Sequence, residues 1–207
     1  RYQEMSSDLP VVIVGAGLVG ALQACYLAKQ GYNVQLYEKR QDPRSVKVVQ
    51  GRSINLAVSR RCMQAIEEIG VADLFNDPKN SVHMPGRIVH LVGKKPTRIA
   101  YGNKKQYLLS FERKRINDIF LNKAEELGVK TFFNHKCMGV DLEKKIARFT
   151  KSQWTAKNFA IQNVQAQFII AADGAFSTVR AQMAKYFIFD FSQEYVLHRY
   201  KELAIIP

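Results

Sequence analysis

Short apolar runs and amphipathic helical segments alternate along the chain, and the first of them predict a βαβ unit. Residues 11–14 are continuously apolar and β-branched, which favours a strand buried on both faces of a parallel sheet. Apolar side chains then recur at helical spacing over residues 18–30, and Gly31 supplies a stop. A second strand is expected over residues 34–37. A unit of this order and size indicates an α/β fold.

The rest of the chain predicts further helices and strands around the same unit. Helices are expected at 61–69 and 113–127, and residues 40–52 and 71–86 are expected to be loops. Strand character is found at residues 87–92, 105–110, 129–133, 137–142, 146–150 and 158–164. The last three form an expected meander with turns near Glu143 and Ser152. Residues 168–172 predict another buried strand, which leads into Asp173-Gly174 and a short helix from about Ser177.

Composition and the two chain ends limit the class of protein. Apolar residues make up 47% and charged residues 24% of 207 residues, which suits a globular chain with one core or two joined lobes. The sequence holds no apolar run long enough to cross a membrane, and its first ten residues lack the apolar middle of a signal peptide. Because the chain opens on Arg1 and stops within an apolar run at Pro207, we expect a fragment that is incomplete at its C-terminus.

The cysteines and histidines argue against a disulfide framework and a metal site. Cys25, Cys62 and Cys137 are widely separated, which fits a reducing compartment. The four histidines show no metal-ligand spacing with these cysteines. We therefore predict no metal.

The net charge of +13 is concentrated in one stretch. Between Lys94 and Arg115 there are eight Lys or Arg against one acid, Glu112. A solvated face is the simplest interpretation. Attraction of dinucleotide phosphates, an acidic substrate or an anionic membrane surface stays open. The stretch lacks a nucleic-acid binding module, so no nucleic-acid partner is expected.

A glycine triplet directly after the first strand predicts dinucleotide binding. Gly15 allows a tight turn, Gly17 lets the backbone approach a pyrophosphate, and Gly20 permits close packing of helix on strand. The helix N-terminus offers free N–H groups to the phosphates. Glu38 ends the second strand, where a carboxylate can accept hydrogen bonds from ribose hydroxyls. The alternative is a glycine turn that merely packs. The motif by itself does not choose between FAD and NAD.

The stretch from Phe168 to Arg180 resembles the Asp-Gly motif of FAD-dependent aromatic hydroxylases. Asp173, Gly174, Ser177 and Arg180 occupy matching positions. In that family the motif contacts flavin and is implicated in handling NADPH. The alternative is a common Asp-Gly turn followed by a surface arginine.

Several other stretches resemble, within that family, the branch that hydroxylates kynurenine. They cover nearly the whole chain: 17–25, 37–40, 50–59, 101–102, 106–110 and 189–193. The resemblance implies a Rossmann-like FAD-binding fold with a parallel sheet, plus strands of a substrate-binding lobe. It implies that residues 1–207 are an FAD-binding domain fragment, in which roughly residues 71–112 contribute to the substrate lobe.

The resemblance also implies roles for individual residues. Beside the motif residues Gly15, Gly17, Gly20, Glu38, Asp173 and Gly174, the residues implied for FAD are Val19, Tyr37, Lys39, Arg40, Ala57, Arg113, Cys137 and Thr178. For the carboxylate of L-kynurenine they are Arg87 and Tyr101, a pairing that suits a bidentate guanidinium and a hydroxyl donor. Without the resemblance, Arg87 would be taken as a surface residue and Tyr101 as a core aromatic. Cys137 replaces a common leucine, so its contact is expected through the backbone, and the loop before Arg87 is slightly long.

The implied activity is conversion of L-kynurenine to 3-hydroxykynurenine with FAD, NADPH and O₂. No residue is required as a general base, because the cofactor performs the chemistry. The implied location is the cytosolic face of the outer mitochondrial membrane, through a C-terminal segment absent from this chain. Two other classes stay open: an NAD-dependent dehydrogenase, and a flavin-binding fragment without enzymatic activity.

Overall fold

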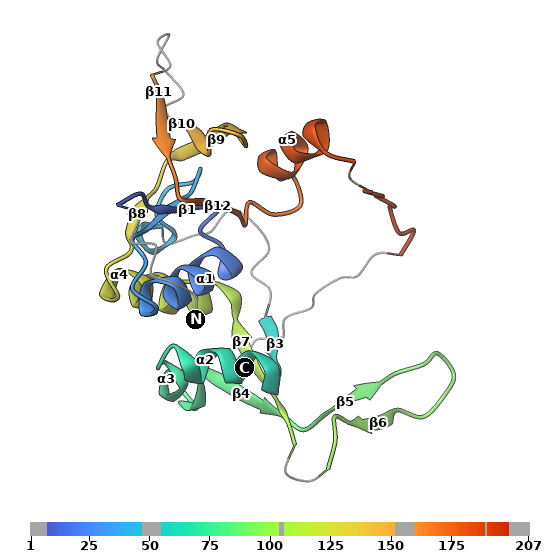
Figure 1. The fold of residues 1–207 in the computed structure, drawn as a ribbon. Coiled ribbons are helices and arrows are strands. Elements are labelled where there is room, and N and C mark those ends of the chain that lie inside the picture. The colour runs from blue at the N-terminus through green and yellow to red at the C-terminus, as the bar shows by residue number, and fades with distance from the viewer. Residues whose placement is uncertain (1–7, 47–54, 104–105, 152–159, 189, 199–207) are drawn as a thin grey trace, which may run out of the picture.

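The chain folds around a four-stranded parallel sheet. The computed structural model describes residues 8–46, 55–103, 106–151, 160–188 and 190–198. The strand order is β12-β1-β2-β8 (Figure 1). Their bounds are β1 Val11–Val14, β2 Val34–Tyr37, β8 Lys130–Phe132 and β12 Phe168–Ala171. Because all four strands run parallel, their carboxyl ends meet at one edge of the sheet.

The two faces of this sheet are covered by different layers. Helices α1 (Leu18–Lys29) and α4 (Arg113–Glu126) pack together on one face, with Ile13 and Leu36 in their core. On the other face lies an antiparallel meander of β9 (His135–Asp141), β10 (Ile146–Lys151) and β11 (Ile161–Gln165). Val12 and Tyr37 point into this second core, against Phe149. The alternation follows from the period of two along a strand.

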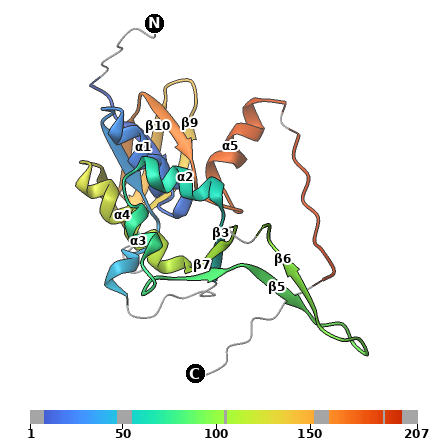
Figure 2. The ribbon, with the colours of Figure 1, turned by 90° about the horizontal axis from the view of Figure 1, so that it is seen from below.

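Most of the remaining elements form a second region. They are β3 Asn55–Val58, α2 Arg60–Glu68, α3 Ala72–Asn76, β4 Ser81–Met84, β5 Gly86–Val89, β6 Thr97–Ala100 and β7 Leu108–Glu112. The other two adjoin the first region: η1 Pro43–Ser45 packs on α4, and α5 Thr178–Tyr186 packs on β9. Strands β3, β7 and β4 make an antiparallel sheet, and β5 pairs with β6 as a hairpin. The hairpin projects away from the parallel sheet in both views (Figures 1 and 2).

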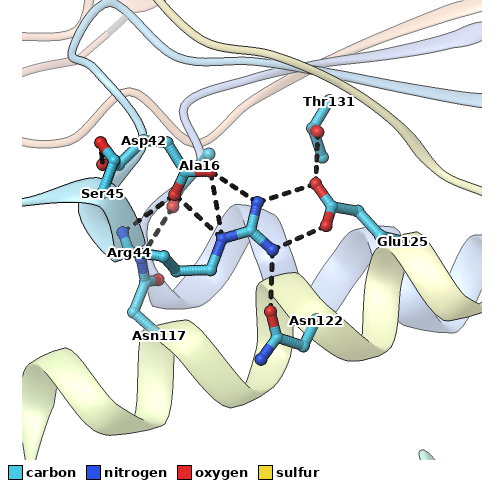
Figure 3. Close-up of polar contacts among 8 residues, drawn as sticks. All are labelled: Ala16, Asp42, Arg44, Ser45, Asn117, Asn122, Glu125 and Thr131. Atoms are coloured by element: carbon cyan, nitrogen blue, oxygen red, sulfur yellow. Dashed lines mark hydrogen bonds and ion pairs between the residues drawn. The ribbon is translucent and has the colours of Figure 1, made fainter.

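Arg44 joins the segment after β2 to helix α4. Its guanidinium bonds Asp42 at 2.7 Å and Glu125 at 2.6 Å, and it also donates to Asn122 at 2.8 Å (Figure 3). Thr131 donates to the same Glu125 carboxylate. Hydrogen bonds from Arg44 hold the pKa values of both carboxyls below their usual range. We call these five residues the Arg44 cluster.

The structure confirms most of the expected elements and corrects several expectations. The expected loop over residues 40–52 contains the short helix η1. Residues 71–86 are not a loop, because they contain α3 and β4. Strands β3 and β6 were not expected. Strand β12 was expected to be buried, but it lies at the edge of the sheet and Phe168 is 54% exposed. The meander of β9, β10 and β11 was predicted, whereas the stretches 47–54 and 152–159 and residue 189 lie outside the described residues.

Candidate dinucleotide-binding site

The glycine turn, residues 15–20, lies at the carboxyl edge of the parallel sheet between the ends of β2 and β12. Gly15 N–H donates to the carbonyl of Tyr37 at 2.7 Å, and Ala172 N–H donates to the carbonyl of Val14 at 2.8 Å. The ends of three strands therefore bring together Gly15, Glu38 and Asp173.

Two glycines of the turn have no room for a side chain, and the third has open space beside it. Gly15 has a φ of +104°, and a Cβ there would overlap the carbonyl of Ala172. A Cβ on Gly20 would overlap the carbonyl of Gly15. At Gly17, by contrast, a Cβ would meet no atom within 4 Å. Gly15 and Gly20 are thus required by packing, whereas packing does not explain Gly17.

Glu38 is bound to the turn by its side chain. One carboxylate oxygen accepts from Ala16 N–H and the other from Arg40 N–H, each at 3.0 Å. The half-buried carboxylate is therefore held in place beside the start of α1. A carboxylate fixed at the end of β2 can still accept from a ligand hydroxyl, since each oxygen has more than one lone pair.

Asn117, on α4, is a member of the site that the sequence did not predict. Its Nδ2 donates to the carbonyl of Ala16 at 3.2 Å, while its Oδ1 is buried without a protein partner (Figure 3). Two buried apolar residues, Leu121 and Ala124, lie one and two turns further along the helix. An amide in an otherwise apolar helical stripe was the available signal.

Asp173 caps the start of α5. Its Oδ2 accepts from the N–H groups of Thr178 at 2.7 Å and Val179 at 3.3 Å, and Ser177 Oγ accepts from Arg180 N–H at 2.9 Å. The other carboxylate oxygen, Oδ1, is buried without a partner in the protein. This arrangement satisfies N–H groups that a helix start leaves unpaired. Asp173 thereby fixes the turn that packs on Gly15.

Two residues implied for FAD, Tyr37 and Cys137, have buried side chains. Tyr37 is 1% exposed and stacks between Phe149 at 3.9 Å and Phe132 at 4.6 Å, and burial raises its pKa to about 12. Only the backbone of Tyr37 reaches the glycine turn. The Cys137 thiol is also buried, which raises its pKa to about 11.

The other implied residues fall into two groups. Val19, Lys39, Arg40 and Thr178 belong to the turn or to segments that adjoin it, and Arg113 lies one helical turn before Asn117. Ala57 is exposed on β3, opposite Ser110 of β7.

The two residues implied for the substrate lie together, but apart from the glycine turn. In the β5–β6 hairpin, Arg87 pairs with Ile99, and Tyr101 N–H donates to the carbonyl of Pro85 at 3.0 Å. Arg87 and Tyr101 therefore share one face of the hairpin, as diagonal neighbours. Tyr101 is 40% exposed, so it is not a core aromatic. The β5–β6 hairpin that carries this pair projects away from the parallel sheet (Figures 1 and 2).

The described residues form neither a cluster of metal ligands nor a helix that could span a membrane. Within those ranges there is no group of three or more His, Cys, Asp or Glu side chains that could hold a metal. The helices described are all too short or too polar to cross a bilayer.

A parallel sheet between a helical layer and an antiparallel meander, with a glycine turn at its carboxyl edge, defines a dinucleotide-binding domain. The chain belongs to the FAD binding domain family, whose profile matches residues 8–195. Membership in this family identifies the cofactor as FAD, whereas the glycine motif alone did not distinguish FAD from NAD. It also confirms the expected fold class.

The chain is similar in sequence to kynurenine 3-monooxygenases. Kynurenine 3-monooxygenase of Caenorhabditis briggsae is 40% identical over 95% of this chain and 45% of its own length. That of Sus scrofa is 37% identical over 98% of this chain and 42% of its own length. The predicted resemblance to the kynurenine-hydroxylating branch is thus confirmed, and the chain spans less than half the length of these relatives.

A solved structure agrees at the level of the fold. The p-nitrophenol 4-monooxygenase of Pseudomonas putida superimposes with a TM-score of 0.68 at 22% identity, over 84% of this chain and 43% of that one.

Proposed function

We propose that this chain forms the FAD-binding part of a monooxygenase that converts L-kynurenine to 3-hydroxykynurenine. The observation that supports this most directly is the glycine turn, in which Gly15 and Gly20 are closed by packing and Gly17 faces open space. That contrast is what a backbone needs if a pyrophosphate is to approach it at one position. The identity to named kynurenine 3-monooxygenases supports the choice of substrate.

The glycine turn and Glu38 would bind the pyrophosphate and the adenosine ribose of FAD. N–H groups at the start of α1, around Gly17 and Val19, would bind the pyrophosphate, and Glu38 would accept from the ribose. Tyr37 and Cys137 would contribute backbone atoms, because their side chains are buried. The remaining assignments are Lys39, Arg40, Ala57 and Arg113, with Asp173, Gly174 and Thr178 toward the flavin. When bound, FAD would take a hydride from NADPH and activate O₂, so that one oxygen atom enters the aromatic ring.

The β5–β6 hairpin would recognise the substrate. The Arg87 guanidinium can bind a carboxylate through two parallel hydrogen bonds, and the Tyr101 hydroxyl on the same face can add a third. We assign residues 71–112 to the substrate lobe on this basis. We also propose that the complete enzyme resides on the cytosolic face of the outer mitochondrial membrane, as the family resemblance implies.

The first test is flavin binding by the 207-residue chain. Purified chain should quench FAD fluorescence and co-elute with FAD, and it should not retain NAD under the same conditions. A folded chain, verified by circular dichroism, that bound no FAD or preferred NAD would contradict the proposal.

The second test replaces the matched part of the pig relative by this chain. With NADPH and L-kynurenine, the chimera should produce 3-hydroxykynurenine. A chimera that binds FAD and consumes NADPH, yet gives no hydroxylated product from kynurenine, would favour the second candidate, flavin binding without this hydroxylation. The observation that favours this second candidate is that Arg87 and Tyr101 are both exposed, on a hairpin that lies apart from the parallel sheet (Figure 2).

A further inference from the structure

The β5–β6 hairpin has a second face and a tip that the proposed substrate contacts do not use. Ile88 pairs with Arg98, so these two side chains lie on the face opposite Arg87 and Tyr101. Residues 91–100 are exposed throughout. We define the hairpin tip surface as three apolar and three cationic residues: Ile88, Leu91, Val92, Lys94, Lys95 and Arg98.

The turn at the tip presents an apolar side chain to solvent. Lys94 N–H donates to the carbonyl of Leu91 at 3.1 Å, and Gly93 has a φ of +72°. A glycine with positive φ at the third position is the signature of a type II turn, which places Val92 at the outer corner. The exposed fractions are 61% for Ile88, 56% for Leu91 and 105% for Val92. Exposed apolar residues clustered beside charge mark an interaction surface.

The charge around this tip has one sign. Between Pro78 and Phe111 the sequence has seven Lys or Arg and no Asp or Glu. None of the ion pairs described involves Lys94, Lys95 or Arg98. A cationic surface without internal acidic partners complements an extended anionic surface, and long basic side chains can lie along a lipid boundary while their charges stay in water.

We propose that the hairpin tip surface docks on an anionic lipid membrane, with Leu91 and Val92 entering the interface and the three cations contacting lipid headgroups. Charge alone would also suit nucleic acid. The fully exposed aliphatic corner favours lipid, because single-stranded nucleic acids are bound mainly through stacked aromatic rings, and none of the six residues of the hairpin tip surface is aromatic. This contact uses neither the glycine turn proposed for FAD nor Arg87 and Tyr101, which are proposed for the substrate.

Vesicle flotation of the 207-residue chain tests the proposal. The chain should float with vesicles of phosphatidylcholine and phosphatidylserine, and should bind far less to phosphatidylcholine alone. Raised NaCl should weaken the binding. For Lys94→Gln/Lys95→Gln, the expected loss in partition is about 25-fold, at roughly fivefold for each cation near an anionic surface. The matched control is Lys130→Gln/Lys136→Gln, which removes the same charge from exposed positions on β8 and β9 and should change binding by less than about twofold.

A reporter separates insertion from charge attraction. Val92 is fully exposed, so Val92→Trp should be tolerated, and its emission should shift to the blue with phosphatidylserine vesicles. Wild type, with its single native tryptophan at position 154, supplies the background. The proposal is overturned if the chain ignores both vesicle types, if the two glutamine double variants behave alike, or if the emission of the Val92→Trp variant does not shift. It is equally overturned if the tip lysines control binding to an RNA or DNA oligonucleotide but not to vesicles.

Discussion

The Glu38 carboxylate binds two backbone N–H groups, one within the glycine turn and one just after β2. It therefore has two roles that a substitution would disturb together: it anchors the turn, and in the proposed function it receives the ribose. Glu38→Ala should weaken FAD binding by about 1.5–3 kcal/mol, the usual contribution of a charge-assisted hydrogen bond. The measurement is FAD titration by fluorescence. Glu143→Ala, at an exposed turn, should bind like wild type, and an unchanged Glu38→Ala affinity would remove Glu38 from the site.

Arg87 has an internal control on the same hairpin. Arg98 is also exposed but lies on the opposite face, so the two arginines differ chiefly in the side to which they point. In the active chimera, Arg87→Ala should weaken L-kynurenine binding by at least about tenfold, since losing one member of a buried charge pair costs about 2–5 kcal/mol. Arg98→Ala should leave kynurenine binding unchanged, and both variants should retain FAD. Equal effects of the two substitutions, or loss of FAD from Arg87→Ala, would contradict the assignment.

At the scale of elements, the strand–turn–helix unit that holds the glycines predicts opposite outcomes for two similar substitutions. Gly17→Ala adds a methyl group where no atom lies within 4 Å, at a backbone φ of −75° that alanine accepts. It should fold with wild-type stability and lose most of its FAD affinity. Gly20→Ala would drive the same methyl group into the Gly15 carbonyl, so it should lower stability by about 1–3 kcal/mol or more. Urea unfolding and FAD titration of both variants make the comparison. Equal FAD affinity for Gly17→Ala and wild type would contradict the proposal that the open space at Gly17 admits the pyrophosphate.

The Arg44 cluster predicts a pH-dependent contribution to stability. Arg44→Met should lower the free energy of unfolding at neutral pH by about 1–2 kcal/mol, because the pair is partly exposed. The folded-state pKa values of Asp42 and Glu125 are depressed, so their stabilisation is present above the unfolded values and is lost as pH falls through the folded values. The difference between wild type and variant should therefore shrink below about pH 4.

A second arginine pair supplies the control for the Arg44 cluster. Arg60→Met breaks the Arg60–Glu67 contact, in which the arginine side chain is 74% exposed. It should change stability by less than about 0.5 kcal/mol at any pH. Equal losses from the two variants, or a loss at Arg44 that persists in acid, would contradict the assigned role.

The elements that the sequence predicted are those whose own residues determine them. The apolar run at Val11–Val14 and the periodic helix Arg113–Glu126 needed no information from elsewhere. Strand β6 was missed because all four of its residues are exposed, so its pattern contains no buried alternation to recognise. Strand β12 was expected to be buried because its residues are apolar. Its exposure depends on its position at the sheet edge, which is a property of topology.

The residues of the candidate site likewise include some that the sequence predicted and some that depend on the packing of the fold. The glycines and Glu38 were predicted because each follows a strand at a recognisable spacing, whereas Asp173 was predicted from the resemblance to the Asp-Gly motif of FAD-dependent aromatic hydroxylases. Asn117 was missed because its partner, the Ala16 carbonyl, is far away in sequence and the contact depends on how α1 packs on α4. The buried side chains of Tyr37 and Cys137 illustrate the converse: a matched motif identifies a segment near the cofactor, but the period of the strand decides where each side chain points.

At the scale of the whole molecule, the described residues contain three separate sheets and one two-stranded hairpin. The candidate dinucleotide site lies at the carboxyl ends of the strands in the parallel sheet. Large apolar side chains are exposed beyond helix α5, among them Phe191, Val196 and Leu197. The chain spans 45% and 42% of the length of the Caenorhabditis briggsae and Sus scrofa relatives. The FAD-binding proposal rests on the glycine turn, whereas the substrate and membrane proposals use opposite faces of the β5–β6 hairpin. FAD titration and vesicle flotation can therefore fail independently of each other.

The pairing of β1 with β12 also determines when the site can form. Val11 lies opposite Phe168, and Gly15 packs on Ala172, so strand β1 is completed only by a strand that lies far along the chain from it. Closing so long a loop is slow, and during translation it must wait until residue 173 has left the ribosome. Ribosome-bound chains that end at Gln165 should therefore fail to capture FAD, whereas those extended by a neutral linker beyond Tyr186 should capture it. Flavin retention by the two arrested complexes would measure this, and an early pause in translation should prolong the interval in which strand β1 is exposed to other unpaired strands.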